Sequence, residues 1–344
     1  MNPRFLASIG GVCVLFASIA ILQATGCNRG SATASLGEVV IYSSIDEPYL
    51  TPLAKRFEQR TGIKVRVVTD TESTKSAALI ERLEAEKDRP QADVYWGNEI
   101  FHTIRLSRQG AFTPYRPSTA EDVPAKWRGQ GDLYTDIGLR VRMIAFSSRP
   151  EFAGKVSQIR GLSDLLGPEF KGKIGICHPG FGTASGHFAA MYVLWGESRY
   201  TQFLKSLRAN EVKLLGGNSA VVDQIAAGNL IAGLSDNDDV NNAKSEGQKI
   251  EAILPDQQAD GMGTLLIPST IALVNRSPHL ENGKKLIDFL CDPAVEKELI
   301  VGRFFEYSVR EAQELKAMDV DYVKCAEQMK VAIEMALKIL QDRS

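Results

Sequence analysis

Hydrophobic and polar positions alternate in two rhythms along the chain after residue 37. Residues 39–43 form a short apolar run closed by polar side chains, which predicts a strand. Between Pro48 and Gly62 the apolar positions recur at spacings of three and four, which predicts an amphipathic helix that ends at the glycine. The next expected elements are a strand at 65–68, a charged helix around Leu79 and Leu83, a strand at 92–96 and a helix at 100–109.

The alternation starts again after an irregular, proline-containing stretch at 110–135. A strand is expected at 141–146. The other expected elements are strands at 173–177, 230–234, 265–267 and 270–274, helices from about 185 and at 200–208, and three closing helical segments, the last at about 320–340. Strands that alternate with helices of these lengths imply an α/β fold, with a parallel sheet and helices on its faces.

The first residues have a different pattern. Arg4 is the only charged side chain before Arg29, and residues 5–22 are apolar or small. Ala24-Thr25-Gly26 then places small residues directly before Cys27, which is typical of a secretory signal. The segment resembles a bacterial lipobox, so we expect a signal peptide over 1–26, a lipid on Cys27 and a flexible tether over 27–37.

Composition excludes several classes of protein. The 344 residues carry 40 basic and 42 acidic side chains and 44% hydrophobic content, which argues against a disordered chain or a polytopic membrane protein. The formal net charge of −2 offers no overall basic surface for nucleic acid. Five cysteines are too few for a disulfide scaffold, and Cys177, Cys291 and Cys325 are an odd number that leaves at least one unpaired within a monomer.

Three segments carry a family resemblance: 41–44 (Ile-Tyr-Ser-Ser), 61–65 (Thr-Gly-Ile-Lys-Val) and 92–99 (Ala-Asp-Val-Tyr-Trp-Gly-Asn-Glu). They resemble the type II periplasmic solute-binding proteins of ABC importers, most of all the ferric-ion-binding branch. The resemblance implies two α/β lobes with mixed sheets, helices on both faces and a ligand cleft between the lobes. The implied lobes are 38–140 and 141–264, with a return segment and the last helices over 265–344.

Two loops of the first lobe are candidates for binding, because ligands in open α/β sheets lie beyond the carboxyl ends of strands. In one loop, Ser43, Ser44 and Asp46 either face the cleft or cap the next helix. In the other, Asn98 matches a position where the ferric-binding family places a carboxylate ligand, with Glu99 beside it. A helix cap at Asn98 is the alternative.

The loop at 180–186 opens a helix after a strand. Its glycine spacing fits neither the dinucleotide fingerprint nor a Walker A loop. Backbone N–H groups at a helix start favour an anion, and the resemblance implies a helper anion such as carbonate or phosphate beside Thr183, Ser185 and Gly186. A plain turn is the alternative.

The loop at 235–239 is rich in acidic and amide side chains but does not fit an EF-hand. The ferric-binding family has two adjacent tyrosine ligands where this chain has Asp238 and Asp239. Carboxylates are also hard oxygen donors, so a metal ion at these two residues is one interpretation. Asp236 or Asp238 holding the ammonium group of an organic solute is a second, and a solvated first helical turn is a third.

Two further pairs of residues complete the predicted site. Arg140 and Arg142 flank the expected crossover and point the same way in a strand. They bind either an anion in the cleft or an acidic group across the lobes. Asn218 and Ser219 continue the family resemblance and join the expected ligand-binding residues.

The resemblance implies a protein that is not an enzyme. It would capture ferric iron with a synergistic anion, as an exported, lipid-anchored monomer, and deliver it to an ABC permease and ATPase. The alternatives are a phosphonate or another small organic or anionic solute, and an extracytoplasmic sensor domain. The four histidines are dispersed, without HExxH or Gly-x-Ser-x-Gly, which argues against a hydrolase.

Replacing Cys27 tests the expected anchor. Cys27→Ser in the native host removes the sulfur that would carry the lipid, so we expect the protein to move from the membrane to the soluble exported fraction. Cell fractionation with immunoblotting measures the shift. A variant that stays in the membrane fraction with residues 5–22 attached would show that these residues anchor the chain themselves.

Overall fold

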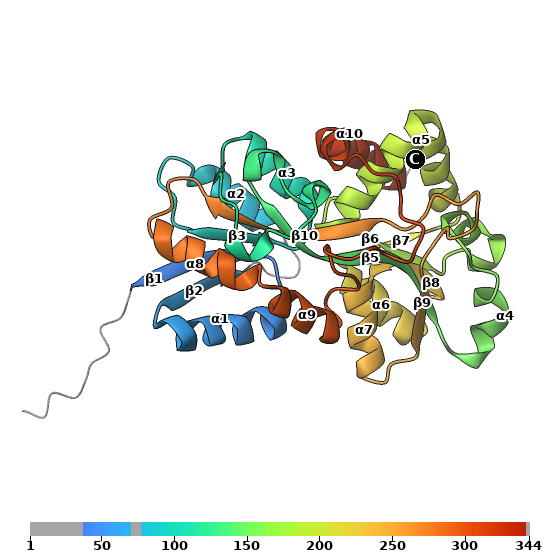
Figure 1. The fold of residues 1–344 in the computed structure, drawn as a ribbon. Helices are drawn as coiled ribbons and strands as arrows, with labels where there is room; N and C mark the ends of the chain where they lie inside the picture. The colour runs from blue at the N-terminus through green and yellow to red at the C-terminus, as the bar shows by residue number, and fades with distance from the viewer. Residues whose placement is uncertain (1–36, 70–76, 342–344) are drawn as a thin grey trace, which may run out of the picture. The chain divides into compact units, whose positions relative to one another are not determined.

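The strands form a continuous mixed sheet. The computed structural model describes residues 37–69 and 77–341, so the expected signal peptide, Cys27 and the expected tether up to residue 36 lie outside the described residues. Within them the strand order is β2-β1-β3-β10-β5-β8-β6-β7, with β4 on β10 and β9 on β5 (Figure 1). The strands are β1 (Glu38–Ser43), β2 (Lys64–Thr69), β3 (Val94–Gly97), β4 (Phe112–Thr113), β5 (Thr135–Ser147), β6 (Ile174–Cys177), β7 (Lys213–Leu215), β8 (Ala232–Asp236), β9 (Ile250–Ile253) and β10 (Leu266–Val274).

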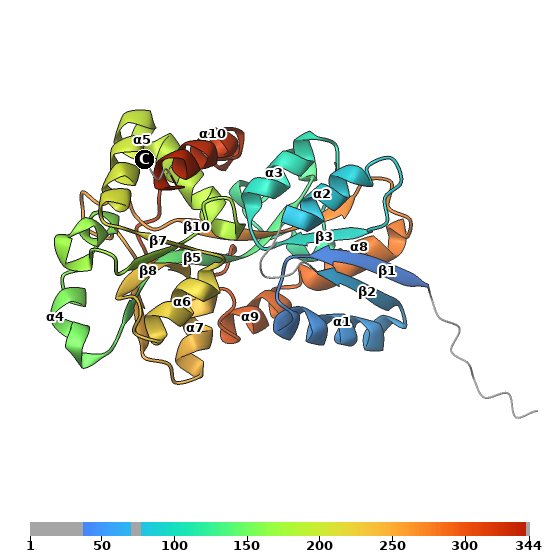
Figure 2. The same cartoon turned by 180° about the vertical axis from the view of Figure 1, so that it is seen from behind.

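Helices cover both faces of this sheet. They are α1 (Glu47–Thr61), α2 (Ala77–Ala85), α3 (Ile100–Arg108), α4 (Ala153–Val156), α5 (Gly182–Ala209), α6 (Asn218–Ala226), α7 (Asn237–Ser245), α8 (Leu280–Leu290), α9 (Pro293–Val301) and α10 (Tyr322–Gln341). The last helix, α10, lies beside α5 in both ribbon views (Figures 1 and 2). None of the helices in residues 37–69 and 77–341 is both long and apolar enough to cross a membrane.

The predicted α/β fold with mixed strands is confirmed, but the purely parallel sheet expected from alternation alone is wrong. Strands β2, β1 and β3 are parallel, and so are β7, β6 and β8. Between the two sets, β10 runs antiparallel to β3 and β5, and β5 runs antiparallel to β8. The strand pattern of a sequence indicates burial and not strand direction, so these three antiparallel pairings could not be predicted from it.

The long strand β5 belongs to both halves of the sheet. Its residues 135–141 pair with β10, and its residues 142–147 pair with β8 and β9. The sequence predicted only 141–146, because Thr135, Asp136 and Gly138 interrupt the apolar pattern in the first half. The strand nevertheless forms there, since every residue from 135 to 142 is buried between other elements.

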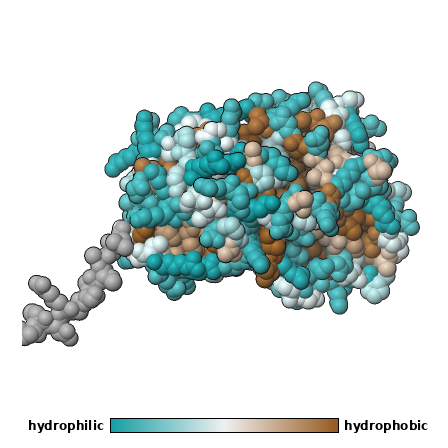
Figure 3. Space-filling view, viewed as in Figure 1, coloured by the Kyte–Doolittle hydropathy of each residue, from teal (hydrophilic) through white to brown (hydrophobic). Residues whose placement is uncertain are grey.

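Side chains of β1 alternate between two hydrophobic cores. Val39 and Ile41 join the core beneath α1, α8 and α9, whereas Val40 and Tyr42 join the core with α2 and α3. A parallel set of strands that is buried on both faces reads as a continuous apolar run, as the sequence of β1 does. Single large hydrophobic side chains, such as Leu280 and Val301, stay exposed, and Figure 3 shows hydrophobic residues interspersed among hydrophilic ones on one face.

The predicted helices in the second half need one revision. The segments expected from 185 and at 200–208 form one element, α5, which is interrupted at Gly196 with φ 72° and ψ 166°. The elements β7, α6 and β9 were not predicted, and they are only three, nine and four residues long. For α7 the sequence offered only a first helical turn, as one of three interpretations. The three closing helices were predicted correctly, and the last starts at Tyr322.

The cysteines of the described residues form no disulfide. Cys177, Cys291 and Cys325 are all buried, and none of them is joined to another cysteine. Cys177 ends β6, as the apolar run before it predicted.

A glycine in β5 allows the close approach of an aromatic ring. Gly138 has φ +60°, where side chains are strained, and a Cβ atom there would overlap the ring of Phe305. The register between β5 and β10 shifts at this glycine, since Pro268 pairs with Leu139 and Ser269 with Ile137. Gly138 is therefore required at this bulge in the strand that joins the two halves.

We expect Gly138→Ala to lower the free energy of unfolding by roughly 2–4 kcal/mol, from backbone strain and overpacking together. Urea denaturation measures the change. Gly154→Ala is the control, because no heavy atom lies within 4 Å of a Cβ built there and it lies in the helix α4, so we expect less than about 1 kcal/mol. Equal effects of the two variants would contradict the packing argument.

The carboxyl of Glu99 caps helix α3. It is 1% exposed and accepts hydrogen bonds from the backbone N–H of Phe101 at 2.6 Å and of His102 at 3.2 Å. Burial raises the pKa of Glu99 from 4.5 to about 7, although these backbone bonds and the charge of Arg140 act in the opposite direction. Folding therefore favours the protonated form of this side chain.

Because this pKa is raised on folding, the stability that Glu99 contributes is present below pH 4.5 and is lost as the pH rises to about 7. Glu99→Gln keeps an acceptor oxygen and does not titrate. We expect wild type to lose roughly 2–3 kcal/mol relative to Glu99→Gln between these pH values, measured by urea denaturation at several pH values. A constant difference across the range would mean that Glu99 titrates normally.

Candidate functional site

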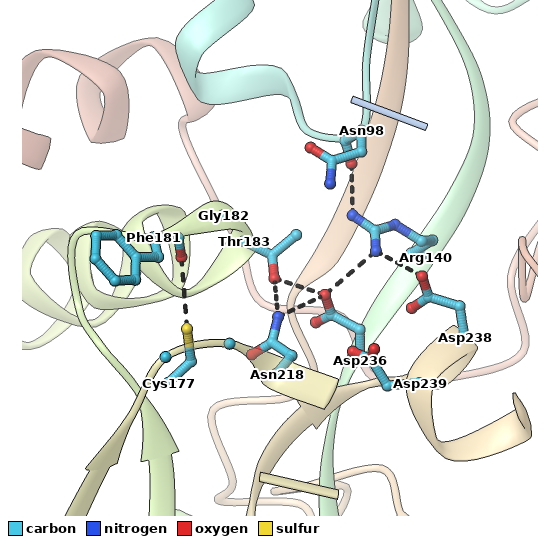
Figure 4. Close-up of a pocket in the computed structure, with 12 residues that line it drawn as sticks. Asn98, Arg140, Cys177, Phe181, Gly182, Thr183, Asn218, Asp236, Asp238 and Asp239 are labelled. Carbon is cyan, nitrogen blue, oxygen red and sulfur yellow. Dashed lines mark hydrogen bonds and ion pairs between the residues drawn. The ribbon is translucent and has the colours of Figure 1, made fainter. Parts of the chain in front are cut away.

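A small polar cavity lies where strand ends and helix starts meet (Figure 4). Its volume is about 30 Å³, which is room for an ion or a water molecule. Asn98 follows β3 in one half of the sheet, and the starts of α5, α6 and α7 come from the other half. The wall consists of Asn98, Arg140, Cys177, Phe181, Gly182, Thr183, Gly216, Gly217, Asn218, Asp236, Asp238 and Asp239.

The carboxylate of Asp236 is the most heavily bonded group in this wall. It ends β8 and is 1% exposed. Arg142 lies directly opposite it in the antiparallel β5–β8 pair and donates from Nη1 at 2.6 Å. Thr183 donates from its hydroxyl at 2.6 Å and Asn218 from its amide nitrogen at 3.1 Å. The carboxylate is thereby fixed in one orientation.

Arg140, two residues before Arg142, reaches a second set of partners. Its Nη1 lies 2.9 Å from Asp238 Oδ2 and 3.3 Å from Asp236 Oδ2. Its Nη2 donates to the main-chain oxygen of Asn98 at 2.7 Å. The alternation of β5 therefore places both guanidinium groups on one side of the strand, as the sequence predicted.

These ion pairs hold the site in its charged form. Burial alone would raise the pKa of Asp236, but Arg142 and Arg140 keep it below its ordinary value of 3.8. Burial alone would lower the pKa of Arg140, but Asp238 and Asp236 raise it above its ordinary value. Since both partners stay charged, the buried groups satisfy one another.

Three carboxylates form a group that could bind a cation. Asp236, Asp238 and Asp239 each offer an oxygen, and these oxygens all lie within 4.8 Å of one another. Asp239 also accepts a hydrogen bond from the hydroxyl of Ser235 at 3.2 Å. Carboxylate oxygens suit hard cations.

Two helix starts face the same cavity. The residues before them, Phe181 for α5 and Gly217 for α6, make no side-chain capping bond. Backbone N–H groups at a helix start and the positive end of the helix dipole favour an anion. The cavity therefore combines groups for a cation with groups for an anion.

Of the predicted site residues, the structure brings seven together in the cavity wall: Asn98, Arg140, Thr183, Asn218, Asp236, Asp238 and Asp239. The other eight lie outside this wall: Ser43, Ser44, Asp46, Glu99, Arg142, Ser185, Gly186 and Ser219.

Most residues outside the wall have partners in the scaffold. Ser43 donates to the main-chain oxygen of Trp96, and the Ser44 hydroxyl accepts from the backbone N–H of Asn98. Ser185 donates to the main-chain oxygen of Gly182. Gly186 packs beneath the ring of Phe101, where a Cβ atom would overlap the ring. Several of these residues thus support the loops that carry the wall.

Sequence reasoning missed five residues of the wall: Cys177, Phe181, Gly182, Gly216 and Gly217. The pair Gly216-Gly217 directly precedes α6 and was the available signal, since glycines at a helix start let backbone approach a ligand. Cys177 offered no such signal, because an apolar strand end is equally typical of a buried core residue.

Comparison with known proteins agrees with this architecture. The iron-bound HitA of Pseudomonas aeruginosa has the same fold, with a TM-score of 0.76, 20% identity and coverage of 88% of this chain and 99% of that one. Iron uptake protein A1 of Synechocystis is 23% identical over 90% of this chain and 87% of its own length. A Salmonella typhimurium protein, provisionally named a 2-aminoethylphosphonate-binding periplasmic protein, is 27% identical over 68% of this chain and 66% of its own.

Residues 39–299 match a single family, which covers more than half of the chain. It is a family of binding proteins and not of enzymes, in agreement with the expectation from the sequence. The chain therefore belongs to the bacterial extracellular solute-binding proteins.

Proposed function

We propose that this solute-binding protein captures ferric iron outside the cytoplasm and delivers it to an ABC permease and ATPase. One observation supports ferric iron as the ligand. The carboxylates of Asp236, Asp238 and Asp239 each offer an oxygen within 4.8 Å of the others. Ferric iron is a hard cation that prefers oxygen donors. A cavity of about 30 Å³ also suits an ion better than an organic solute.

The relatives support the same ligand. The Synechocystis protein is named for iron uptake, and the Pseudomonas structure contains iron. This chain has Asp238 and Asp239 in place of the tyrosine pair of ferric-binding proteins. We propose that these two carboxylates, with Asp236, hold the metal.

The helix starts supply the rest of the proposed site. An anion that accompanies the metal would lie beside Thr183 and Asn218, near the N–H groups that open α5 and α6. Asn98 lies on the opposite side of the cavity, and Arg140 connects the two sides. We limit the proposed ligand contacts to the three carboxylates, Thr183, Asn218 and Asn98.

The remaining parts of the proposal concern the cell. We propose that Cys27 carries a lipid and tethers an exported monomer to a membrane through residues 27–37. The lobe limits of 38–140 and 141–264, with a return segment over 265–344, remain a prediction. A boundary at 140/141 would fall within β5, near the point where its partner changes from β10 to β8.

A second candidate ligand is a small zwitterion that carries a phosphonate and an ammonium group. The observation that favours it is the pairing of two helix starts with three carboxylates in one cavity. The phosphonate would lie at the helix starts, and Asp238 or Asp239 would bind the ammonium. The name of the Salmonella relative refers to such a compound.

A thermal-shift experiment on residues 28–344 separates the two ligands. We expect saturating Fe³⁺ to raise the melting temperature by at least about 5 °C, because a ligand bound only by the folded state stabilises it. Asp238→Ala and Asp239→Ala should each remove most of this shift. Asp88→Ala is the control, because this carboxylate is exposed and lies outside the cavity.

The bound metal should also leave the protein nearly colourless, because carboxylates lack the charge-transfer absorption of phenolate–iron sites. A strong red colour would contradict the proposed ligands. A shift with 2-aminoethylphosphonate and none with Fe³⁺ would replace the first candidate by the second. An iron affinity that both substitutions leave unchanged would mean that the 236–239 loop is only the start of a helix.

A further inference from the structure

One side chain in the cavity touches both halves of the sheet. Arg140 donates from Nη2 to the main-chain oxygen of Asn98, which follows β3, at 2.7 Å. From Nη1 it reaches Asp238, at the start of α7, at 2.9 Å. Arg140 itself lies on β5, the strand that both halves share (Figure 4). Its guanidinium group therefore links the two halves across the cavity.

Arg142 provides the contrast. It lies on the same strand and on the same side, and it is equally buried. Its contacts are Asp236, Thr183 and Asn218, at 2.6 to 3.2 Å. All three follow strands β6 to β8 in one half of the sheet, so Arg142 positions Asp236 without connecting the halves.

Arg140 also occupies the place that suits a cation. Its Nη1 lies within 3.3 Å of two of the three carboxylates that form the acidic group. A ligand cation bound by Asp238 would compete with the guanidinium for this carboxylate. Because two positive charges at such distances repel strongly in a buried site, the cation and the guanidinium cannot both keep these contacts.

We propose that Arg140 is an internal stand-in for the ligand: it holds the ligand-free cavity closed by joining Asn98 to Asp238, and it releases Asp238 when a cation enters. The identity of the cation rests on the proposed function, whereas the closure does not. Arg140 is then a specificity-determining residue. A cation of charge one gains little over the guanidinium at these oxygens, whereas a cation of charge two or three displaces it, so the site selects multivalent ions.

Three variants of the soluble chain over residues 28–344 test the inference. Arg140→Gln removes the charge, Arg140→Lys keeps it, and Arg142→Gln is the matched control that leaves the link between the halves in place. Circular dichroism first verifies that each variant is folded. Small-angle X-ray scattering without any ligand then measures the radius of gyration.

We expect a larger radius of gyration for Arg140→Gln than for wild type, and values close to wild type for Arg140→Lys and Arg142→Gln. This comparison needs no ligand, so it stays valid if ferric iron is the wrong cargo. If the radius of gyration of Arg140→Gln equals that of wild type, the proposed closure is wrong.

The second measurement is the affinity for Fe³⁺, supplied as its nitrilotriacetate complex and followed by chelator competition. We expect Arg140→Gln to bind the metal at least about ten-fold more tightly than wild type, because a competing positive charge is gone. Arg140→Lys should bind it as wild type does. Weaker binding by folded Arg140→Gln would overturn the competition and make Arg140 a direct ligand contact. If neither wild type nor any variant binds Fe³⁺ but the radii of gyration are as expected, the proposal of iron as the ligand is wrong. The proposed closure by Arg140 is then still supported.

Discussion

The buried negative charge of Asp236 is the constraint on which the architecture of the cavity depends. A carboxylate that is 1% exposed needs a permanent counter-charge, and two arginines from one strand supply it. Losing one partner of such a buried pair typically costs about 3–5 kcal/mol. The pairing also requires the register of β5 against β8, since Arg142 lies opposite Asp236. A slip by one residue would turn both arginines to the other face of the sheet.

This constraint ties the site to the scaffold. β5 is at once a strand of both halves and the element that carries both guanidinium groups, and its bulge at Gly138 lies two residues before Arg140. The carboxylates lie at the end of β8 and in the first turn of α7. Because α7 follows β8 without any intervening loop residue, the positions of these carboxylates are fixed by the strand. Binding chemistry and sheet geometry therefore cannot vary independently in this family member.

Sequence patterns predicted the apolar parts of the fold well, because burial on a strand or helix leaves a periodic record. Val39 to Tyr42 read directly as a strand buried on both faces. The first half of β5 shows no such periodic pattern, because its polar residues are buried by contacts with distant segments of the chain. Tyr307, for example, pairs with Leu139 across 168 positions of the chain, which no local pattern reports.

The site was predicted in part for the same reason. Chemistry at strand ends indicated Thr183, Asp236, Asp238 and Asp239, the family resemblance added Asn218, and the structure brings these residues to one cavity. Local sequence could not distinguish Glu99 as a cap from Glu99 as a ligand, because both need a carboxylate at a helix start. Gly186 looked like part of an anion loop, yet its role depends on the ring of Phe101 from a helix some 80 positions away.

The buried cysteines give this protein a set of internal reporters. Cys291 lies in the hydrophobic core beneath α1 and α8, whereas Cys177 and Cys325 lie in the core with α5 and α10. Burial raises the pKa of the Cys291 and Cys325 thiols, so they stay protonated and inert while the cores are closed. A thiol reagent reaches the sulfur of Cys291 or Cys325 only when its own core opens, whereas Cys177 also lines the cavity. The order in which Cys291 and Cys325 react would thus record which of the two cores loosens first.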